Sequence, residues 1–279
     1  MSKPAGKQRP EQTPVLIIGA HRSGTSATAH ALELMGLQLG QRLDSHREPK
    51  KLQKLHDDYL LHVGATWHCP APFLTSLQTA DGHRNCVAFL RKNIDKNFAD
   101  IFGYRKDPKG LWLLARLKRS AAWGWKEPRT TLFAQAWLEI FPDARIIHVI
   151  RHPLAAAASI RERELKFRDK GDAPNPGLED LDYCLRLVLM YIEAGEGLAK
   201  KTSHYRLVRF ENVQSDPRES LNELAKFSGI NASRTRLLKA AVTIRPPNTT
   251  RNDDLPQTAD QEIYRRYPKL KELGYAQMD

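Results

Sequence analysis

The sequence predicts an α/β fold, in which an open parallel sheet is flanked by helices on both faces. Two observations carry this prediction. Short apolar runs rich in β-branched residues recur along the chain, as in buried parallel strands, and segments with helical spacing follow them. No internal repeat or obvious linker separates these units. We therefore expect a single domain over residues 14–279, preceded by a short disordered leader at residues 1–13.

The first half of the chain begins with one strand–helix pair. Residues 15–18 form the expected strand and residues 25–35 the expected helix, which ends at the stop signal Gly36. Residues 48–67 have the spacing of an amphipathic helix. Over residues 70–110 the signals are mixed and mainly helical.

Two strand–turn–helix units follow, over residues 121–142 and 144–167. In the second unit the strand is the run RIIHVI, and Pro153 lies in the first helical turn, where its missing N–H costs nothing. A loop is expected over residues 168–180 and a helix over residues 181–200.

The last strand–helix pair is expected at residues 205–210 and 216–230, with Asp216 as the N-cap of the helix. Residues 245–256 then read as an extended loop, which a short basic helix follows.

Composition narrows the function classes. Lys and Arg number 44 against 32 acids, and the net charge of +12 favours anionic partners such as phosphorylated cofactors or acidic substrates. The charge is dispersed and no zinc-finger spacing occurs, so we expect no nucleic-acid partner. Three widely spaced cysteines predict neither a disulfide framework nor a zinc site. With no signal peptide and no apolar run of about 20 residues, we expect a cytoplasmic protein without a membrane span.

The first strand leads into GAHRSGTS, residues 19–26, which has the outline of a P-loop. A glycine-rich turn at a helix N-terminus presents free backbone N–H groups to an anion, and the helix dipole adds partial positive charge. Thr25 stands where a triphosphate loop has lysine, and Arg22 supplies a permanent positive charge earlier in the loop. We therefore expect a P-loop-containing sheet with an unusual phosphate ligand. The candidate ligand residues are Arg22, Ser23, Gly24, Thr25 and Ser26.

A second anion signal lies in VIRHPLAAAASIRER. Arg151 falls at the carboxyl end of an expected strand, where open α/β sheets bind ligands, and Ser159 follows it in the helix. This pair suits a second phosphate group.

Together these segments resemble the sulfotransferases that use 3′-phosphoadenosine 5′-phosphosulfate (PAPS), in the bacterial and tyrosylprotein-type branch. HRSGTS is similar to the family's 5′-phosphosulfate loop, and RHPLAAAAS to its 3′-phosphate motif. WGWKEPRT resembles the family's WKDPR element, and RLVRFENV followed by DP resembles RYEDL…DP. The resemblance covers most of residues 14–230.

The resemblance implies transfer of a sulfuryl group from PAPS to an acceptor hydroxyl, which leaves adenosine 3′,5′-bisphosphate (PAP). Loop residues would hold the phosphosulfate, and Arg151 with Ser159 the 3′-phosphate. The family's C-terminal RKGxxG element is absent, so Arg245 or Arg251 is a possible substitute.

Sulfuryl transfer needs cations for the charge that builds on the leaving group and a base for the acceptor proton. Arg22 and Lys126 are the candidate cations. Aligning the stretch after the first helix with the family places Glu48 on the family's acid, while Asp44 and His46 remain rivals for the base. No carboxylate cage accompanies the loop, so we expect no metal.

Trp67 is a candidate for the acceptor pocket and equally for the core. Carbohydrates, small molecules and peptide tyrosine all remain open as acceptors, and the sequence does not indicate an oligomeric state.

Two other functions remain as alternatives. A small-molecule kinase with a P-loop would need the loop lysine and an acidic magnesium ligand. A non-enzymatic polyanion-binding protein would explain the charge but not the two ordered phosphate motifs.

Overall fold

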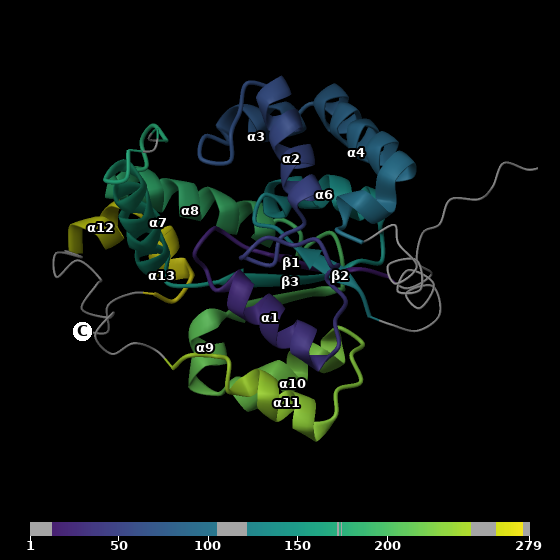
Figure 1. Ribbon diagram of the computed structural model, residues 1–279. Helices are drawn as coiled ribbons and strands as arrows, with labels where there is room; N and C mark the ends of the chain where they lie inside the picture. The colour runs from purple at the N-terminus through teal and green to yellow at the C-terminus, as the bar shows by residue number, and fades with distance from the viewer. Residues whose placement is uncertain (1–12, 105–121, 172, 174, 247–260, 276–279) are drawn as a thin grey trace, which may run out of the picture.

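The computed structural model describes residues 13–104, 122–171, 173, 175–246 and 261–275 (Figure 1). Its centre is a parallel sheet of four strands in the order β2-β1-β3-β4. The strands are β1 Val15–Ile18, β2 Gly124–Lys126, β3 Arg145–Ile150 and β4 Tyr205–Arg209. The predicted α/β fold with an open parallel sheet is therefore confirmed.

Side chains of β1 alternate between two hydrophobic cores, because successive residues of a strand point to opposite faces. Leu16 and Ile18 belong to the larger core, whereas Val15 and Ile17 belong to the smaller one. All four are fully buried, which explains why the run VLII is continuously apolar.

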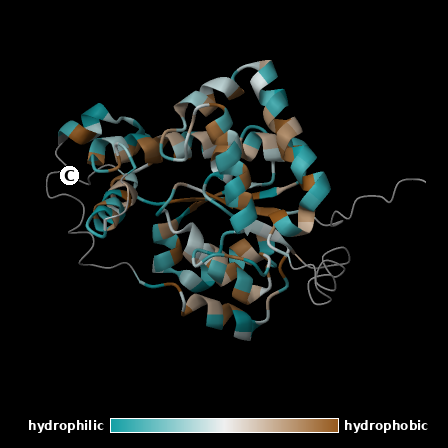
Figure 2. Ribbon diagram, turned by 45° about the horizontal axis from the view of Figure 1, so that its top comes forward, coloured by the Kyte–Doolittle hydropathy of each residue, from teal (hydrophilic) through white to brown (hydrophobic). Residues whose placement is uncertain are grey.

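Helices cover both faces of the sheet (Figure 1). One face carries α1 Thr25–Met35, α9 Phe210–Ser215, α10 Pro217–Phe227 and α11 Arg234–Ala241, which contribute to the smaller core. The larger core lies under α2 Lys50–His62, α3 Ala71–Leu77, α4 Ala80–Ile101, α6 Thr130–Ile140, α7 Pro153–Arg168 and α8 Leu181–Glu196. Two short helices, α12 Gln261–Arg266 and α13 Lys269–Glu272, add to the same core. Hydrophobic residues gather at the strands and on the inward helix surfaces (Figure 2).

Most predicted elements are confirmed, and α1 and β3 have the predicted bounds. Asp216 caps α10, since its carboxylate accepts the N–H of Glu219. Four predictions were wrong in detail, and one of them is the helix predicted over residues 216–230, which ends at Phe227. The helix predicted over residues 48–67 is shorter, because Gly64 follows it at a φ of 70°. Residue Phe210 begins α9 instead of ending β4. Residues 197–200 lie beyond the end of α8.

Some expectations fall outside the described residues. They include the leader apart from Thr13 and the expected loop after residue 246. Among the described helices, none is both long and apolar enough to cross a membrane.

Candidate active site

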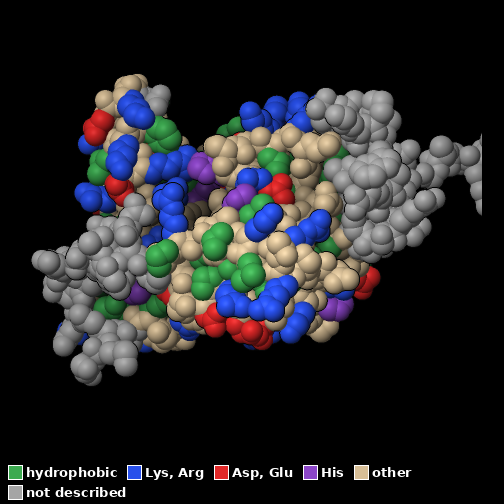
Figure 3. Space-filling view, turned by 60° about the horizontal axis from the view of Figure 1, so that its bottom comes forward, with side chains coloured by type: hydrophobic (Ala, Val, Ile, Leu, Met, Phe, Trp, Pro, Cys, Tyr) green, Lys and Arg blue, Asp and Glu red, His purple; other side chains and the backbone are tan. Residues whose placement is uncertain are grey.

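The carboxyl ends of all four parallel strands meet at one edge of the sheet, and each contributes to one cavity of about 360 Å³. The loop after β1 supplies Arg22, β2 ends at Lys126, β3 is followed by Arg151, and β4 by Phe210. Ligands of open α/β sheets bind at this edge, and the volume falls in the range of about 300–1,000 Å³ for small-molecule sites. Figure 3 shows Lys, Arg and His side chains around a hollow of the surface.

The cavity unites residues that are far apart in the sequence. Of the predicted site residues it is lined by Arg22, Gly24, Thr25, Ser26, Asp44, His46, Glu48, Lys126, Arg151 and Ser159. His21, Gln53, Arg129, Arg163 and Phe210 also line it and were not predicted.

Two glycines shape the loop between β1 and α1. A Cβ atom on Gly19 would lie 2.2 Å from the backbone oxygen of Val149, and one on Gly24 would lie 2.3 Å from the Phe210 ring. Both glycines have positive φ angles, of 146° and 92°, which side chains disfavour. The loop therefore passes close to β3 and α9, and α1 begins directly after it at Thr25.

The side chains of the loop divide into structural and cavity-lining groups. Ser23 is buried, donates its hydroxyl to the carbonyl of Ala20 at 2.7 Å and does not line the cavity. Its hydroxyl therefore stabilises the turn, and a ligand role for Ser23 stays a prediction. Arg22 has a φ of 68° and donates its Nε to Ser159 Oγ at 2.9 Å.

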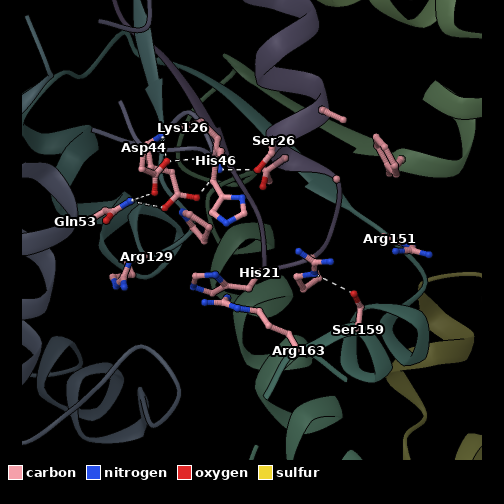
Figure 4. Close-up of a pocket in the computed structure, with 17 residues that line it drawn as sticks. His21, Ser26, Asp44, His46, Gln53, Lys126, Arg129, Arg151, Ser159 and Arg163 are labelled. Atoms are coloured by element: carbon pink, nitrogen blue, oxygen red, sulfur yellow. Dashed lines mark hydrogen bonds and ion pairs between the residues drawn. The ribbon is translucent and has the colours of Figure 1, made fainter. Parts of the chain in front are cut away.

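Arg151 and Ser159 lie on the side of the cavity away from Lys126 (Figure 4). Arg151 directly follows β3, and Ser159 lies in α7. The turn between these elements is held by Glu211, whose carboxylate accepts the N–H of His152 at 2.7 Å. Tyr275 donates its hydroxyl to the other oxygen of Glu211 at 3.1 Å. The C-terminal segment thus braces the turn that carries Arg151.

Lys126 and Glu48 form a buried ion pair. Lys126 is fully buried, and its Nζ lies 2.5 Å from Glu48 Oε1 and 2.9 Å from Ser26 Oγ. Gln53 donates to the second carboxylate oxygen of Glu48 at 2.8 Å. Burial raises the pKa of Glu48 to about 7, although the positive charge of Lys126 opposes the shift.

The rival bases have different environments. Although burial acts to raise it, the pKa of Asp44 is lowered, because its carboxylate accepts hydrogen bonds from the N–H of Glu48, from Gln53 and from the N–H of His46. Asp44 therefore stabilises the conformation of its loop by accepting these hydrogen bonds. His46 is exposed, and partial burial together with the charge of Lys126 lowers its pKa. Of the three candidates, Glu48 alone combines burial with a pKa near neutrality.

Behind the cavity, Glu127 organises a second buried charge cluster. Its carboxylate accepts hydrogen bonds from His56 Nδ1 at 2.6 Å and from Arg129 at 2.6 Å. Trp137 donates to His56 Nε2 at 3.1 Å, so the Nδ1 of His56 carries the proton. Burial would raise the pKa of Glu127, but Arg129 and His56 outweigh it and hold the pKa well below its usual range.

Arg129 also forms an ion pair with Asp57 at 2.7 Å, so two carboxylates compensate its charge. In the segment WKEPRT, only the lysine was predicted to have a role. The opposite charges of Glu127 and Arg129, two residues apart beside an apolar segment, were the sequence signal that could have indicated this charge cluster.

Of the two places predicted for Trp67, the structure shows the core, since Trp67 packs against the larger hydrophobic core and does not line the cavity. It packs behind His21 instead, with 4.5 Å between ring centroids. Burial and the charge of Arg129 lower the pKa of His21 well below its usual value, so this ring is neutral.

Two further expectations concern the 3′-phosphate and metals. Arg245 does not line the cavity, and its carbonyl accepts a hydrogen bond from Gln214, while Arg251 lies outside the described residues. Within the described residues, no cluster of His, Cys, Asp and Glu side chains has the arrangement of a metal site.

Comparison with known proteins gave one family and several solved structures. The family model described as "Sulfotransferase family" matches residues 14–234. No curated protein matches the sequence.

Three of the similar structures are themselves sulfotransferases. The domain from the Synechococcus PCC 7002 olefin synthase is 18% identical, with 94% of this chain and 86% of that chain covered and a TM-score of 0.43. Sulfotransferase STF9 from Mycobacterium avium is 15% identical, with 98% and 79% covered and a TM-score of 0.48. Mouse sulfotransferase SULT7A1, complexed with PAP, is 14% identical, with 98% and 88% covered and a TM-score of 0.47.

Proposed function

This chain belongs to the sulfotransferase family, and we propose that it takes the sulfuryl group from PAPS and passes it to a hydroxyl of a carbohydrate, small-molecule or peptide acceptor. One observation carries the choice of donor. Arg22 and Ser159 are 137 residues apart in sequence, yet the Nε of Arg22 donates to Ser159 Oγ at 2.9 Å. The two phosphate motifs therefore meet in one cavity, as a ligand with a 5′-phosphosulfate and a 3′-phosphate requires.

The donor would lie along the strand ends. The N–H groups at the start of α1, with Arg22, Thr25 and Ser26, would hold the 5′-phosphosulfate, because a helix N-terminus favours anions. Arg151 and Ser159 would hold the 3′-phosphate, which carries about −1.5 to −2 charges near neutral pH. This orientation directs the sulfuryl group toward Glu48.

The proposed chemistry is an in-line transfer. The acceptor oxygen forms a bond to sulfur while the bond from sulfur to the 5′-phosphate oxygen breaks, and Glu48 takes the acceptor proton. A base with a pKa of about 7 suits this step, since a large fraction of it is ionised at neutral pH and it is still basic enough to accept the proton. The products are a sulfate ester and PAP.

Lys126 couples the two ends of the reaction. In the resting site its ammonium pairs with Glu48 at 2.5 Å and with Ser26 of the loop. When Glu48 takes up the proton, the carboxylate loses its charge and its hold on Lys126 weakens. The ammonium is then available for the negative charge that builds on the leaving phosphate oxygen.

We propose a cytoplasmic location as well. Cys69, Cys86 and Cys184 are all unpaired, as expected in a reducing compartment.

Ligand-induced stabilisation tests the donor assignment. We expect PAP to raise the unfolding free energy by about 2.7 kcal/mol at 100 times its dissociation constant, and ATP with magnesium to act less. Transfer of labelled sulfate from PAPS to a panel of hydroxyl compounds would then identify the acceptor. Stronger stabilisation by ATP with magnesium than by PAP would show that the donor is wrong and favour the kinase alternative.

A further inference from the structure

The cavity is lined by more cationic side chains than are assigned to binding the donor. Its lining includes five cationic side chains and two carboxylates, and the carboxylates are Asp44 and Glu48. Both carboxylates are already hydrogen-bonded inside the site, by Gln53 and by Lys126. The excess charge therefore belongs to the arginines.

Each arginine except one has an assigned partner. Arg22 and Arg151 belong to the donor site of the proposed function, and Arg129 is compensated by Glu127 and by an acid of α2. The remaining arginine, Arg163, makes no ion pair with a carboxylate anywhere in the described part of the chain. Its guanidinium lies over the ring of Phe167, with the central carbon 5.0 Å from the ring centroid.

The side chain of Arg163 points away from the residues assigned to the donor's 3′-phosphate. It lies four residues after Ser159 on α7, so both side chains project from one face of the helix. Figure 4 shows the guanidinium of Arg163 beneath His21, extended toward Arg129 and away from Arg151. Its charge also acts on the base side of the cavity, where it contributes to the lowered pKa values of His21 and His46.

His21 offers a second polar group at the same place. Its Nε2 atom is buried and has no hydrogen-bond partner among the described residues. Because the ring is neutral, a bound oxygen would satisfy this nitrogen without adding charge. A ligand between Arg163 and His21 would thus contact both an exposed cation and a ring nitrogen that has no other hydrogen-bond partner.

We propose that Arg163 binds an anionic group on the acceptor, so that the enzyme selects hydroxyl compounds that also carry a carboxylate, sulfate or phosphate. This inference rests on the proposed function, because it assumes that PAPS fills the opposite side of the cavity. An anionic acceptor entering beside a polyanionic donor is repelled unless a separate cation compensates it. Arg163 supplies that cation, and its planar fork matches the two oxygens of such groups.

Matched pairs of probe acceptors test the proposal. The pairs are 4-hydroxyphenylacetate with its amide, methyl glucuronoside with methyl glucoside, and 4-hydroxyphenyl phosphate with the neutral 4-methoxyphenol. For each probe we would measure kcat/KM for sulfate transfer and also binding to the PAP-saturated protein, which gives a result even without turnover. We expect the wild-type protein to prefer at least one anionic probe by about tenfold or more, the usual effect of a charge-assisted hydrogen bond.

The variants are Arg163→Gln, Arg163→Lys and, as matched control, Lys166→Gln. Lys166 lies on the same helix but pairs with Glu162 and does not line the cavity. We expect the ratio of kcat/KM for the anionic probe to that for the neutral probe to fall toward one in Arg163→Gln. The ratio should be partly retained in Arg163→Lys and unchanged in Lys166→Gln. Raising the salt concentration should weaken the wild-type preference, because the contact is partly exposed.

Three results would overturn the proposal. They are equal use and binding of the anionic and neutral probes by wild type, an unchanged preference in Arg163→Gln, and a loss of PAP affinity in Arg163→Gln that matches its loss of anionic-probe binding. The last result would assign Arg163 to the donor. Failure of PAP to bind the wild-type protein would instead refute the proposed function, so the two failures are distinguishable.

Discussion

Replacing Glu48 with glutamine is the most direct test of the proposed base. The amide keeps the volume of the side chain and one oxygen for Lys126, but it cannot accept the acceptor proton. We expect turnover to fall by about 10²–10⁴, the usual range for loss of a general base. PAP affinity should survive, since the donor phosphates are assigned to the loop and to Arg151 across the cavity.

The surroundings of Glu48 also set a pH signature. Its pKa is about 7 in the folded protein against an ordinary value of 4.5, so the folded state binds this proton more tightly than the unfolded state does. Wild-type stability should therefore fall by about 3 kcal/mol as the pH rises from 4.5 to 7, at 1.36 kcal/mol for each pKa unit. The glutamine variant lacks this contribution, so its stability should improve relative to wild type over the same interval.

Two measurements follow. The first is kcat/KM against pH, where wild type should rise with a midpoint of about 7, because the base works only when ionised. Glu48→Gln should lack this rise and recover part of its activity at alkaline pH, where the acceptor ionises by itself. The second is urea unfolding at about pH 5 and about pH 8.

His46→Gln is the matched control, because His46 shares the loop with Glu48 but is exposed. Near-normal turnover in Glu48→Gln together with collapse in His46→Gln would make His46 the base and refute the argument from burial. Retained activity in both variants, and in Asp44→Asn, would mean that the acceptor is acidic enough to react without a base.

Two further predictions concern the 3′-phosphate side. Arg151→Ala should weaken PAP binding by about tenfold or more, and reduce kcat less, because a charge-assisted contact to phosphate is lost; Ser159→Ala should act in the same direction more weakly. Unchanged PAP affinity in calorimetry would make Arg151 purely structural. Tyr275→Phe removes the phenol that donates to Glu211 at 3.1 Å, so it should loosen the turn and lower PAP affinity several-fold without altering the pH profile. An unaltered affinity would show that the C-terminal segment does not brace the site.

The elements that the sequence predicted well are those with strong local signals. Residues 15–18 are buried on both faces and therefore continuously apolar, and Gly36 ends α1 as expected. Pro153 and Asp216 mark helix starts through their own backbone chemistry. Helix α11 has no such local signal in the sequence, because only Ala240 and Ala241 of its eight residues are buried.

The candidate site was predictable only where a motif marks it. Gln53 was missed because it gains its place through contacts across the fold, and Arg163, the last residue of the quoted stretch VIRHPLAAAASIRER, was missed because no role was assigned to the residues after Ser159. For Ser23 the sequence did not show that its hydroxyl donates to the carbonyl of Ala20, because a serine in a loop can donate either to a ligand or to the turn itself. The sequence left Trp67 open between the acceptor pocket and the core, because its neighbour in space, His21, is distant in sequence.

The lysine that is missing from the loop has a counterpart in space. Thr25 occupies the loop position, while Lys126 reaches the next loop residue, Ser26, from the end of β2 at 2.9 Å. A lysine on the loop itself would follow the ligand phosphates, whereas Lys126 is shared between the loop and the carboxylate of Glu48. In the proposed mechanism, its availability to the leaving group depends on the protonation of Glu48. A carboxylate that gains a proton as the bond to the leaving oxygen breaks would release the cation when it is needed. The proposed coupling suits a single sulfuryl transfer and would account for a loop position without a lysine.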